Sequence, residues 1–408
     1  MIVISGRQRA TLAILLITAL ALLLCGCNSG TIGARVIVSP DAFVQRAALP
    51  YKVKWVKDLG SGERYIDDTP FERSVPLVVD ETIYVGSTAE IFTALNARTS
   101  NLIWQFQPEG AVESTAAVDS DKVYFGDSNG KIYALNRDYG DLVWSYRTKG
   151  EILSKLTVSN DVVYAATSFN RVLALNANSG ELLWLADHDP ADDFTIRGVS
   201  SPLVTKNAIY AGYADGSLAA IDPATGKELW SNTLKRGQRF IDVDATPILH
   251  KGRLYVPSFD GKLYCLEADT GTIVWSFEHG GVSRVAIHNG RIFFSSDDNQ
   301  FYAVSLQNGE LIWSFNVKAD YELDSIYKSK RSRNQIPGQA AIVNDVVVFA
   351  SMSGYVYALD MQSGVKRWTY LPGEGVTSGV VAYKDRLYFL SNAGKLYCLR
   401  QSGPPQGY

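Results

Sequence analysis

The chain has 408 residues, of which 46% are hydrophobic and 20% are charged. Lys and Arg number 39 against 42 Asp and Glu, so the formal net charge is -3, and no excess of positive charge points to a nucleic acid as a partner. This balance is typical of a large domain with a well-packed core and excludes the strongly charged, apolar-poor composition of a disordered chain.

Residues 1–26 have the pattern of a lipoprotein signal peptide. Arg7 and Arg9 supply a positive start, and an apolar stretch follows over residues 10–24. That stretch is short for a membrane-spanning helix and suits a secretory signal. It ends in Leu24-Cys-Gly-Cys27, which resembles a bacterial lipobox. We expect cleavage before Cys27 and lipidation of its thiol, because several acyl chains hold a protein durably on a bilayer; an uncleaved signal anchor is the alternative.

Residues 27–50 are predicted to be a flexible tether that begins with the lipidated cysteine. They contain two glycines and two prolines and no part of the repeat described below. Asn28, rather than Asp, follows Cys27, and in the sorting rule of enteric lipoproteins this favours the outer membrane. We therefore expect a protein anchored by lipid to the periplasmic face of the outer membrane.

One repeating unit fills residues 51–400. Each tryptophan occupies the same point of this unit, and successive tryptophans are 49, 40, 40, 46, 45, 38 and 55 residues apart. A period near forty is typical of an array of one supersecondary unit. Within each unit, short runs of Val, Ile, Leu, Tyr and Phe alternate with Gly, Asn and Asp turn signals, which predicts antiparallel strands. The eight tryptophans are Trp55, Trp104, Trp144, Trp184, Trp230, Trp275, Trp313 and Trp368.

Four short strands per unit predict an all-β fold, an eight-bladed β-propeller of four-stranded antiparallel blades. The last unit stops near Leu399 before any tryptophan, whereas Tyr51–Trp55 looks like the end of a unit that has no beginning. The N-terminal strand is therefore predicted to complete the last blade and close the ring, with residues 401–408 left as a tail. Each tryptophan is expected to pack between blades and donate its indole N–H to a neighbouring backbone carbonyl.

Cysteine and histidine patterns predict no catalytic residue, no metal and no cofactor. Cys265 and Cys398 fill the same slot of two units three blades apart, too distant for a disulfide, so both are expected to be buried hydrophobes. The histidines show no metal-ligand spacing, and the chain has no haem-attachment motif, phosphate-binding loop or nucleophile elbow. The four histidines are His188, His250, His279 and His288.

The phrase Asp222-Pro-Ala-Thr-Gly226, followed by Trp230, resembles the tryptophan-docking repeats of pyrroloquinoline-quinone (PQQ) dehydrogenases, which are also eight-bladed. Those enzymes hold the quinone beside a disulfide between adjacent cysteines and coordinate Ca²⁺ with carboxylate and amide groups. This chain has no adjacent pair of cysteines. The resemblance therefore implies the fold, and a quinone-dependent enzyme is kept as an alternative function, together with an envelope-binding propeller of another partner.

Two segments depart from the repeat, Asp192–Pro202 before the fourth blade and Arg239–Pro247 before the fifth. With the lipobox, the tether and the quinoprotein-like units, their motifs Ile-Arg-Gly-x-Ser-x-Pro and Asp-Val-Asp-x-Thr-Pro resemble the BamB-type outer-membrane assembly lipoproteins over essentially the whole mature chain. The resemblance implies a non-enzymatic scaffold of the β-barrel assembly (BAM) complex. Such a scaffold binds the POTRA domains of BamA, works with the other BAM subunits, and aids folding and insertion of unfolded outer-membrane protein precursors.

The same resemblance assigns a docking role to Phe194, Ile196 and Arg197 in the first segment and to Asp242 and Asp244 in the second. An arginine fork, two carboxylates and apolar anchors on one surface suit a protein partner. Two alternatives stay open: the aspartates cap turns or hold Arg197 in place, or Arg197 braces the blades internally.

An insertion over about residues 320–335 is long and basic and matches no motif. It is expected to be a species-specific contact or a disordered loop. Capture of extended client strands by edge pairing also suits a propeller, although the sequence does not place such an edge.

Overall fold

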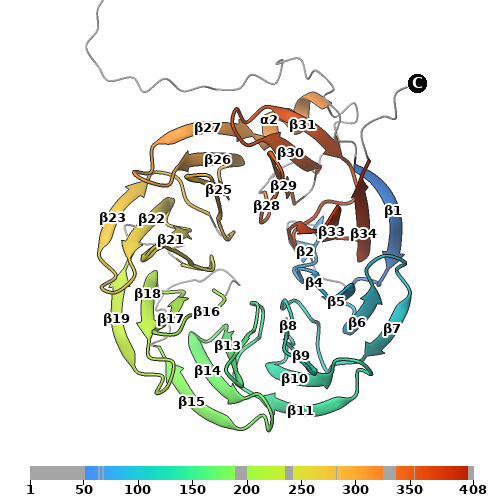
Figure 1. Ribbon diagram of the computed structural model, residues 1–408, viewed down its shortest axis with the longest axis vertical. Helices are drawn as coiled ribbons and strands as arrows, with labels where there is room; N and C mark the ends of the chain where they lie inside the picture. The colour runs from blue at the N-terminus through green and yellow to red at the C-terminus, as the bar shows by residue number, and fades with distance from the viewer. Residues whose placement is uncertain are drawn as a thin grey trace, which may run out of the picture. The chain divides into compact units, whose positions relative to one another are not determined.

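The computed structural model describes residues 51–62, 65–66, 69–188, 200–234, 242–281, 283–324, 337–352 and 354–402. Within these ranges, eight four-stranded antiparallel sheets follow one another around a ring (Figure 1). The predicted all-β propeller is therefore confirmed, including its number of blades.

Each blade has an inner strand at the axis, two middle strands and an outer strand at the rim (Figure 1). In chain order the strands of the first four blades are β4 (Leu77–Val79), β5 (Thr82–Ser87), β6 (Ile91–Asn96) and β7 (Leu102–Phe106); β8 (Ala117–Val118), β9 (Lys122–Gly126), β10 (Lys131–Asn136) and β11 (Leu142–Arg147); β12 (Thr157–Ser159), β13 (Val162–Thr167), β14 (Arg171–Asn176) and β15 (Leu182–Asp187); β16 (Leu203–Val204), β17 (Ile209–Gly212), β18 (Ser217–Ile221) and β19 (Glu228–Thr233).

The last four blades have the same order of strands. They are β20 (Ile248–His250), β21 (Arg253–Ser258), β22 (Lys262–Glu267) and β23 (Ile273–Phe277); β24 (Ala286–His288), β25 (Arg291–Ser295), β26 (Gln300–Ser305) and β27 (Leu311–Asn316); β28 (Ala341–Val343), β29 (Val346–Ala350), β30 (Val356–Asp360) and β31 (Lys366–Tyr370); β32 (Val381–Tyr383), β33 (Arg386–Leu390), β34 (Lys395–Gln401) and β1 (Tyr51–Asp58). Outside the blades, β2 (Tyr65–Ile66) and β3 (Thr69–Pro70) form a hairpin, and α2 (Val317–Asp324) is a helix.

The middle strands carry continuous apolar runs because both of their faces are covered by neighbouring blades. Every residue of β9, β17 and β29 is buried. The hydrophobic core is accordingly divided among the junctions between blades. In one such cluster, Tyr124 and Trp144 of the second blade pack with Val163 and Leu173 of the third. Stability therefore depends on each blade meeting its two neighbours, as in other repeat architectures.

Each outer strand contains a β-bulge immediately before its tryptophan. In the second blade, Ala134 pairs with Trp144 and Leu135 with Leu142, which leaves Val143 as the extra residue. A bulge redirects side chains relative to the strand's alternation. Leu142 and Val143 therefore both face solvent, at 50% and 48% exposure, while Trp144 is 8% exposed and points into the junction.

The predicted indole hydrogen bonds are confirmed at five tryptophans, with Nε1 to carbonyl oxygen distances of 2.9–3.1 Å. The acceptors belong to the next blade, as in the bond from Trp230 to Ala268. Trp55 and Trp275 depart from the prediction, because their Nε1 atoms are buried without a hydrogen-bond partner. The five donors are Trp104, Trp144, Trp184, Trp230 and Trp313.

A glycine in the next blade makes room for the indole at six of these positions. Gly226 has a φ of +71°, and a Cβ atom on it would lie 2.6 Å from the ring of Trp184. A side chain there meets two penalties, since L residues disfavour this left-handed conformation and the aromatic ring occupies the space. At these six positions, the turn glycine that precedes an outer strand thus serves the tryptophan of the preceding blade.

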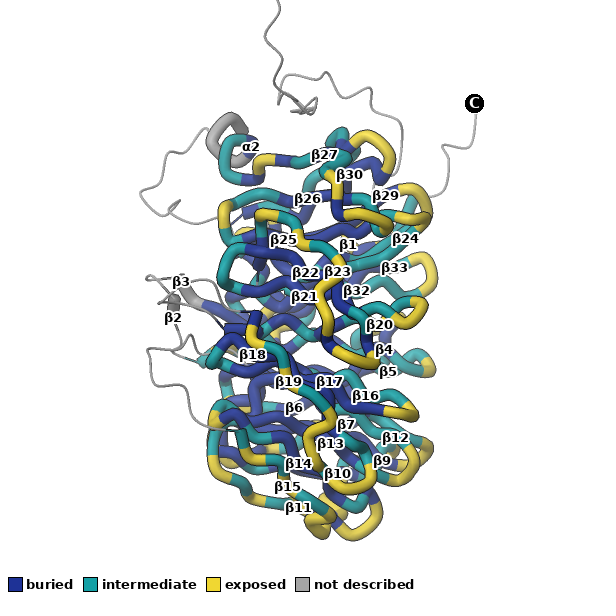
Figure 2. The backbone as a smooth tube through the Cα atoms, turned by 90° about the vertical axis from the view of Figure 1, so that its left-hand side faces the viewer, coloured by how far each residue is buried: buried dark blue, intermediate teal, exposed yellow. Residues whose placement is uncertain are grey.

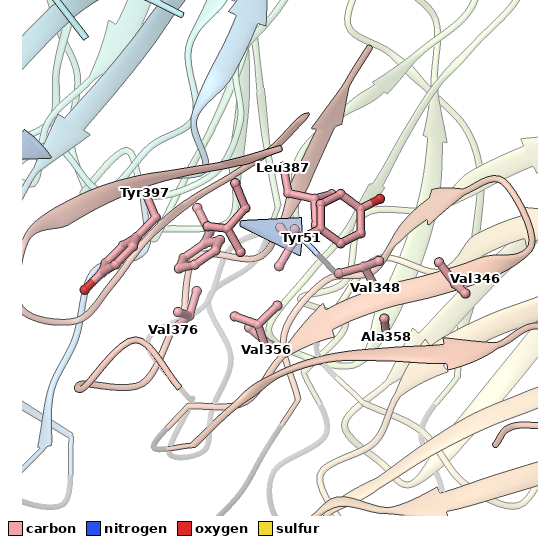
Figure 3. Close-up of a cluster of buried hydrophobic side chains, with 12 residues drawn as sticks. Tyr51, Val346, Val348, Val356, Ala358, Val376, Leu387 and Tyr397 are labelled. Carbon is pink, nitrogen blue, oxygen red and sulfur yellow. The ribbon is translucent and has the colours of Figure 1, made fainter. Parts of the chain in front are cut away.

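The ring closes as predicted, with β1 antiparallel to β34 over Tyr51↔Gln401 to Asp58↔Lys395. Tyr51 is 5% exposed and lies in the core between the last two blades, near Val348 and Leu387 (Figure 3). Its ring centroid is 5.5 Å from that of Trp368. The N-terminal strand serves as the outer strand of the eighth blade. Its first residue, Tyr51, therefore packs against Trp368, the tryptophan of the seventh blade.

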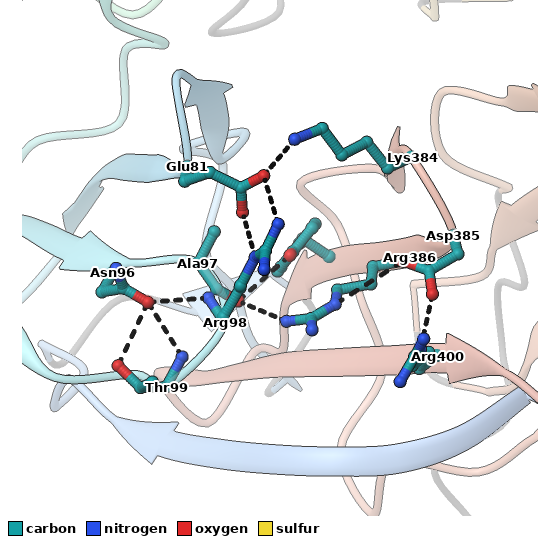
Figure 4. Close-up of polar contacts among 10 residues, drawn as sticks. Glu81, Asn96, Ala97, Arg98, Thr99, Lys384, Asp385, Arg386 and Arg400 are labelled. Atoms are coloured by element: carbon teal, nitrogen blue, oxygen red, sulfur yellow. Dashed lines mark hydrogen bonds and ion pairs between the residues drawn. The ribbon is translucent and has the colours of Figure 1, made fainter.

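Polar contacts also join the first and last blades (Figure 4). Glu81 accepts a hydrogen bond from Arg98 at 3.0 Å and forms an ion pair with Lys384. The Arg386 guanidinium donates to the carbonyl oxygen of Ala97 at 3.1 Å. Exposed ion pairs contribute little to stability. We conclude that apolar packing around Tyr51 stabilises the closure more than these polar contacts do.

The insertion after the sixth blade begins with α2, which the sequence analysis did not anticipate. Asn316 caps the helix, because its Oδ1 accepts the N–H of Ala319 at 2.8 Å. Asp320 is 2% exposed and pairs with Lys366 Nζ at 2.6 Å, so the start of the insertion is fixed to the seventh blade rather than being a loose loop. Residues 325–336 lie outside the described residues.

Cys265 and Cys398 are free and fully buried, as expected for small hydrophobes. The signal peptide, Cys27 and the tether lie outside the described residues. Within the described part of the chain, no helix is long and apolar enough to cross a bilayer.

Candidate partner-binding face

The connections from each outer strand to the next inner strand end on one face of the ring, because strand directions are the same in every blade. We call this the loop face. The hairpin β2–β3 and helix α2, which belong to two of these connections, project from the same side in Figure 2, on the left. The opposite side carries short exposed turns (Figure 2). Both segments that depart from the repeat are connections of the loop face.

The predicted docking residues are divided between described and undescribed parts of this face. Phe194, Ile196 and Arg197 fall within residues 189–199, outside the described residues. Asp242 and Asp244 are described and lie just before the inner strand β20 of the fifth blade. The proposed proximity of Arg197 to the two aspartates therefore stays a prediction.

His188, the last described residue before the segment 189–199, has well-defined contacts. Its Nε2 lies 3.0 Å from Asp215 Oδ2 and 3.1 Å from Ser217 Oγ, and its ring stacks on Tyr213 at 4.1 Å. Burial raises the pKa of Asp215, but the hydrogen bonds from His188 and Ser217 outweigh it and lower that pKa to about 2. The serine and the carboxylate meet the same ring nitrogen. A serine nucleophile needs them on different nitrogens, so this trio fixes the His188 side chain instead.

Asp242 is 1% exposed, so its carboxylate is not presented at the surface of the described chain. Its backbone carbonyl accepts the N–H of Phe259 at 3.0 Å, and the N–H of the following Val243 bonds to the carbonyl of Tyr213 at 3.1 Å. These bonds fasten the Asp242 segment to the fourth and fifth blades. The alternative in which the aspartates serve the fold rather than a partner is compatible with this position of Asp242.

Asp244 is only partly buried and lines a small pocket on the loop face between the third, fourth and fifth blades. Burial and the charge of Asp242 raise the pKa of Asp244 to about 7, against the opposing effect of Arg73. Asp244 is therefore a carboxyl group held in an environment that disfavours its charge. The other polar residues of the pocket are Thr167, Asn170, Arg171, Ser200 and Tyr213. Ser200 is the first described residue after the segment 189–199.

Arg73 and Glu113 were not identified from the sequence, although they belong to this polar cluster. Both lie four residues before the first paired residue of an inner strand, as Asp244 does. Arg73 Nε is 3.8 Å from Glu113 Oε2, and Glu113 is fully buried. The shared position, four residues before the inner strand, becomes apparent when the repeats are aligned on their inner strands rather than on their tryptophans. Among the described residues, no group of three His, Cys, Asp or Glu side chains could hold a metal ion.

These features define a closed, eight-bladed propeller of quinoprotein-like repeats with a polar cluster on its loop face. The family profile described as "Outer membrane protein assembly factor BamB" matches residues 51–147 and 87–315, which together are more than half of the chain. The chain therefore belongs to the BamB family.

Individual curated relatives match over shorter stretches. A protein named outer membrane protein assembly factor BamB from Kangiella koreensis is 36% identical over 61 residues, 14% of this chain and 16% of that protein. The one from Legionella pneumophila is 29% identical over 69 residues, 15% of this chain and 18% of that protein. The aligned part thus spans less than a fifth of either relative's length.

Solved structures extend the similarity of fold to almost the whole propeller. BamB from Moraxella catarrhalis has a TM-score of 0.71 at 20% identity and covers 86% of this chain and 100% of that chain. The quinohemoprotein alcohol dehydrogenase of Comamonas testosteroni has a TM-score of 0.67 at 16% identity, covering 88% of this chain and 78% of the enzyme. At such identities the likeness concerns the fold alone.

Proposed function

We propose that this chain is a non-enzymatic scaffold lipoprotein of the outer-membrane β-barrel assembly machinery. Its loop face binds the POTRA domains of BamA, and Cys27 carries the lipid that anchors it to the periplasmic face of the outer membrane. Through this contact, and with the other BAM subunits, it aids folding and insertion of outer-membrane protein precursors. Membership of the BamB family supports this role.

Asp244 is the observation that carries the assignment of the loop face. A partly buried carboxyl group whose charge is disfavoured by its surroundings costs folding stability, and such groups are concentrated at functional sites. A cationic group of a partner would remove that cost by pairing with the carboxylate. Asp242 influences the site indirectly, because it is buried and its charge raises the pKa of Asp244.

In this proposal, Phe194, Ile196 and Arg197 complete the contact from the segment 189–199. The pocket beside Asp244 includes Ser200 at the end of that segment. Apolar side chains next to a charged pair are the usual makeup of a binding hot spot. The Ile196 and Phe194 side chains would supply the buried area, and Arg197 would engage an acidic or planar group of the partner.

Affinity capture from membranes tests the proposal. The tagged full-length lipoprotein is expected to retain the barrel subunit, while Arg197→Ala and Asp244→Ala retain much less. Asp269→Ala is the matched control, because Asp269 is an exposed acid in the turn between β22 and β23, on the opposite face of the ring. Absence of any barrel-assembly subunit from the wild-type eluate argues against the function. Full retention by both loop-face variants argues against the assigned binding residues but not against the proposed function.

A quinone-dependent enzyme is the second candidate, because the dehydrogenase of Comamonas testosteroni shares the fold. That reading predicts dye-linked oxidation of alcohols or sugars after reconstitution with the quinone and Ca²⁺. The scaffold proposal predicts no such turnover. An envelope-binding propeller with a different partner is the outcome if neither turnover nor a barrel subunit is found.

A further inference from the structure

Eight equivalent residues encircle the axis two positions before the first paired residue of each inner strand. We call this set the axial ring; it consists of Val75, Thr115, Lys155, Ser201, Thr246, Arg284, Gln339 and Gly379. Neighbouring members touch. The N–H of Val75 donates to Thr115 Oγ1 at 3.4 Å, and the N–H of Lys155 donates to Ser201 Oγ at 2.9 Å. The eight residues therefore lie at one level of the propeller, around its axis.

Only two members of the axial ring are charged, and both are cationic. Lys155 is exposed to solvent and Arg284 is partly buried. The Nε atom of Arg284 is buried without a hydrogen-bond partner. Burial lowers the pKa of both groups, and the charge of Arg284 lowers the pKa of Lys155 further. The two cations thus act on each other across a neutral ring.

Two like charges at one level of the axis repel each other unless a counter-charge accompanies them, and the buried Nε–H of Arg284 also lacks an acceptor. An oxyanion between the two would supply that charge, because the arginine fork donates two parallel hydrogen bonds to phosphate or carboxylate oxygens and the lysine adds a third donor. The remaining six members of the ring are uncharged and include three hydroxyl side chains and one amide, which can complete the hydrogen bonding of a small anion.

We propose that the axial ring is a binding site for a small oxyanion, a phosphate or carboxylate group, held between Lys155 and Arg284. This site is separate from the partner contact proposed for the loop face and does not depend on it. Asp244, Glu113 and Arg73 lie two residues earlier in their segments, at the next level of the axis. That neighbouring level therefore carries two carboxyl groups and one guanidinium, whereas the charged members of the axial ring are both cations.

Isothermal titration calorimetry on the full chain in detergent tests the site, in a low-salt zwitterionic buffer at pH 7. Inorganic phosphate and acetate are titrated separately, with sodium chloride at equal ionic strength as the reference. We expect saturable binding of one anion per chain for phosphate, acetate or both, and the arm that binds more tightly identifies the chemical class. Absence of saturable heat in both arms overturns the proposal.

Variants locate the anion. Arg284→Gln and Lys155→Gln are expected to weaken binding at least tenfold, and Arg284→Lys is expected to lose less because it keeps the charge but not the fork. Lys206→Gln is the matched control, since Lys206 is an exposed lysine in the turn between β16 and β17. Unchanged affinity in both Gln variants of the ring overturns the location. In anion-free buffer, Lys155→Gln should melt at or above the wild-type temperature; a clearly lower melting temperature contradicts the unfavourable charge pair.

Discussion

Replacing Asp244 with asparagine is expected to stabilise the propeller, and more strongly at alkaline than at acidic pH. The pKa of a carboxyl group in an unfolded chain is near 4, whereas burial and the charge of Asp242 raise that of Asp244 to about 7 in the fold. Between these values the folded state binds the proton more tightly. The contribution of Asp244 is therefore most favourable below about pH 4 and is lost as the pH rises through about 7.

The size of this free-energy penalty follows from the difference of about three between the folded and unfolded pKa values of Asp244, at about 1.4 kcal/mol for each pKa unit. The wild-type penalty is about 1.4 kcal/mol at pH 5 and reaches about 4 kcal/mol at pH 8, as an upper limit for this single group. Asparagine is neutral at both values and nearly isosteric. Asp244→Asn should therefore gain roughly three times as much free energy of unfolding over wild type at pH 8 as at pH 5.

Urea titrations of the wild type and Asp244→Asn at pH 5 and pH 8 measure this difference. Asp269→Asn serves as the control for loss of a charge at an exposed turn and should change stability equally at both values. If the two pH values give the same difference for Asp244→Asn, or if asparagine destabilises at pH 8, the charge of Asp244 is not disfavoured as argued. If the proposed function is correct, Asp244→Asn should also bind the partner more weakly than the wild type.

Three further tests probe the packing of the ring by thermal or urea unfolding. Gly226→Ala should cost about 2–4 kcal/mol, from the left-handed backbone and the clash with the indole, whereas Gly290→Ala, whose φ is +73° with nothing within 4 Å, should cost only about 1–2 kcal/mol. Equal costs would contradict the docking geometry. Trp230→Phe should lose about 1 kcal/mol more than Trp275→Phe, because only the first indole donates a hydrogen bond; the reverse order would contradict this. Tyr51→Ala should cost about 3–5 kcal/mol by emptying the closure core, and a loss below about 1 kcal/mol would show that β1 does not hold the ring.

The ring itself was predictable because its signal is repeated. Six of the tryptophans dock on a glycine of the next blade, and each lies in an outer strand, so the spacing of Trp104, Trp144 and Trp184 follows the blades directly. Closure was predictable from the two incomplete units at the ends of the chain. The bulges were not, because adjacent apolar residues such as Leu142 and Val143 resemble a buried run until pairing shows that both face solvent.

The polar cluster and the axial ring could be anticipated only in part. Asp244 stood out because its segment breaks the repeat, but Arg73 and Glu113 come from other blades and approach one another only when the first two blades pack together. The same holds for Lys155 and Arg284, which are three blades apart in sequence. Helix α2 escaped notice because a short helix depends on tertiary contacts, here the ion pair of Asp320 with Lys366, more than on local pattern.

The most direct test of the proposed scaffold role is the affinity of the purified chain for the isolated POTRA domains of the BamA protein from the same organism. Biolayer interferometry of wild type, Asp244→Ala and Asp269→Ala should give saturable binding for the wild type, a loss of at least tenfold for Asp244→Ala, and no change for Asp269→Ala. Absence of saturable binding by the wild type, or equal affinity for all three proteins, would contradict the assignment of the loop face as the partner-binding surface.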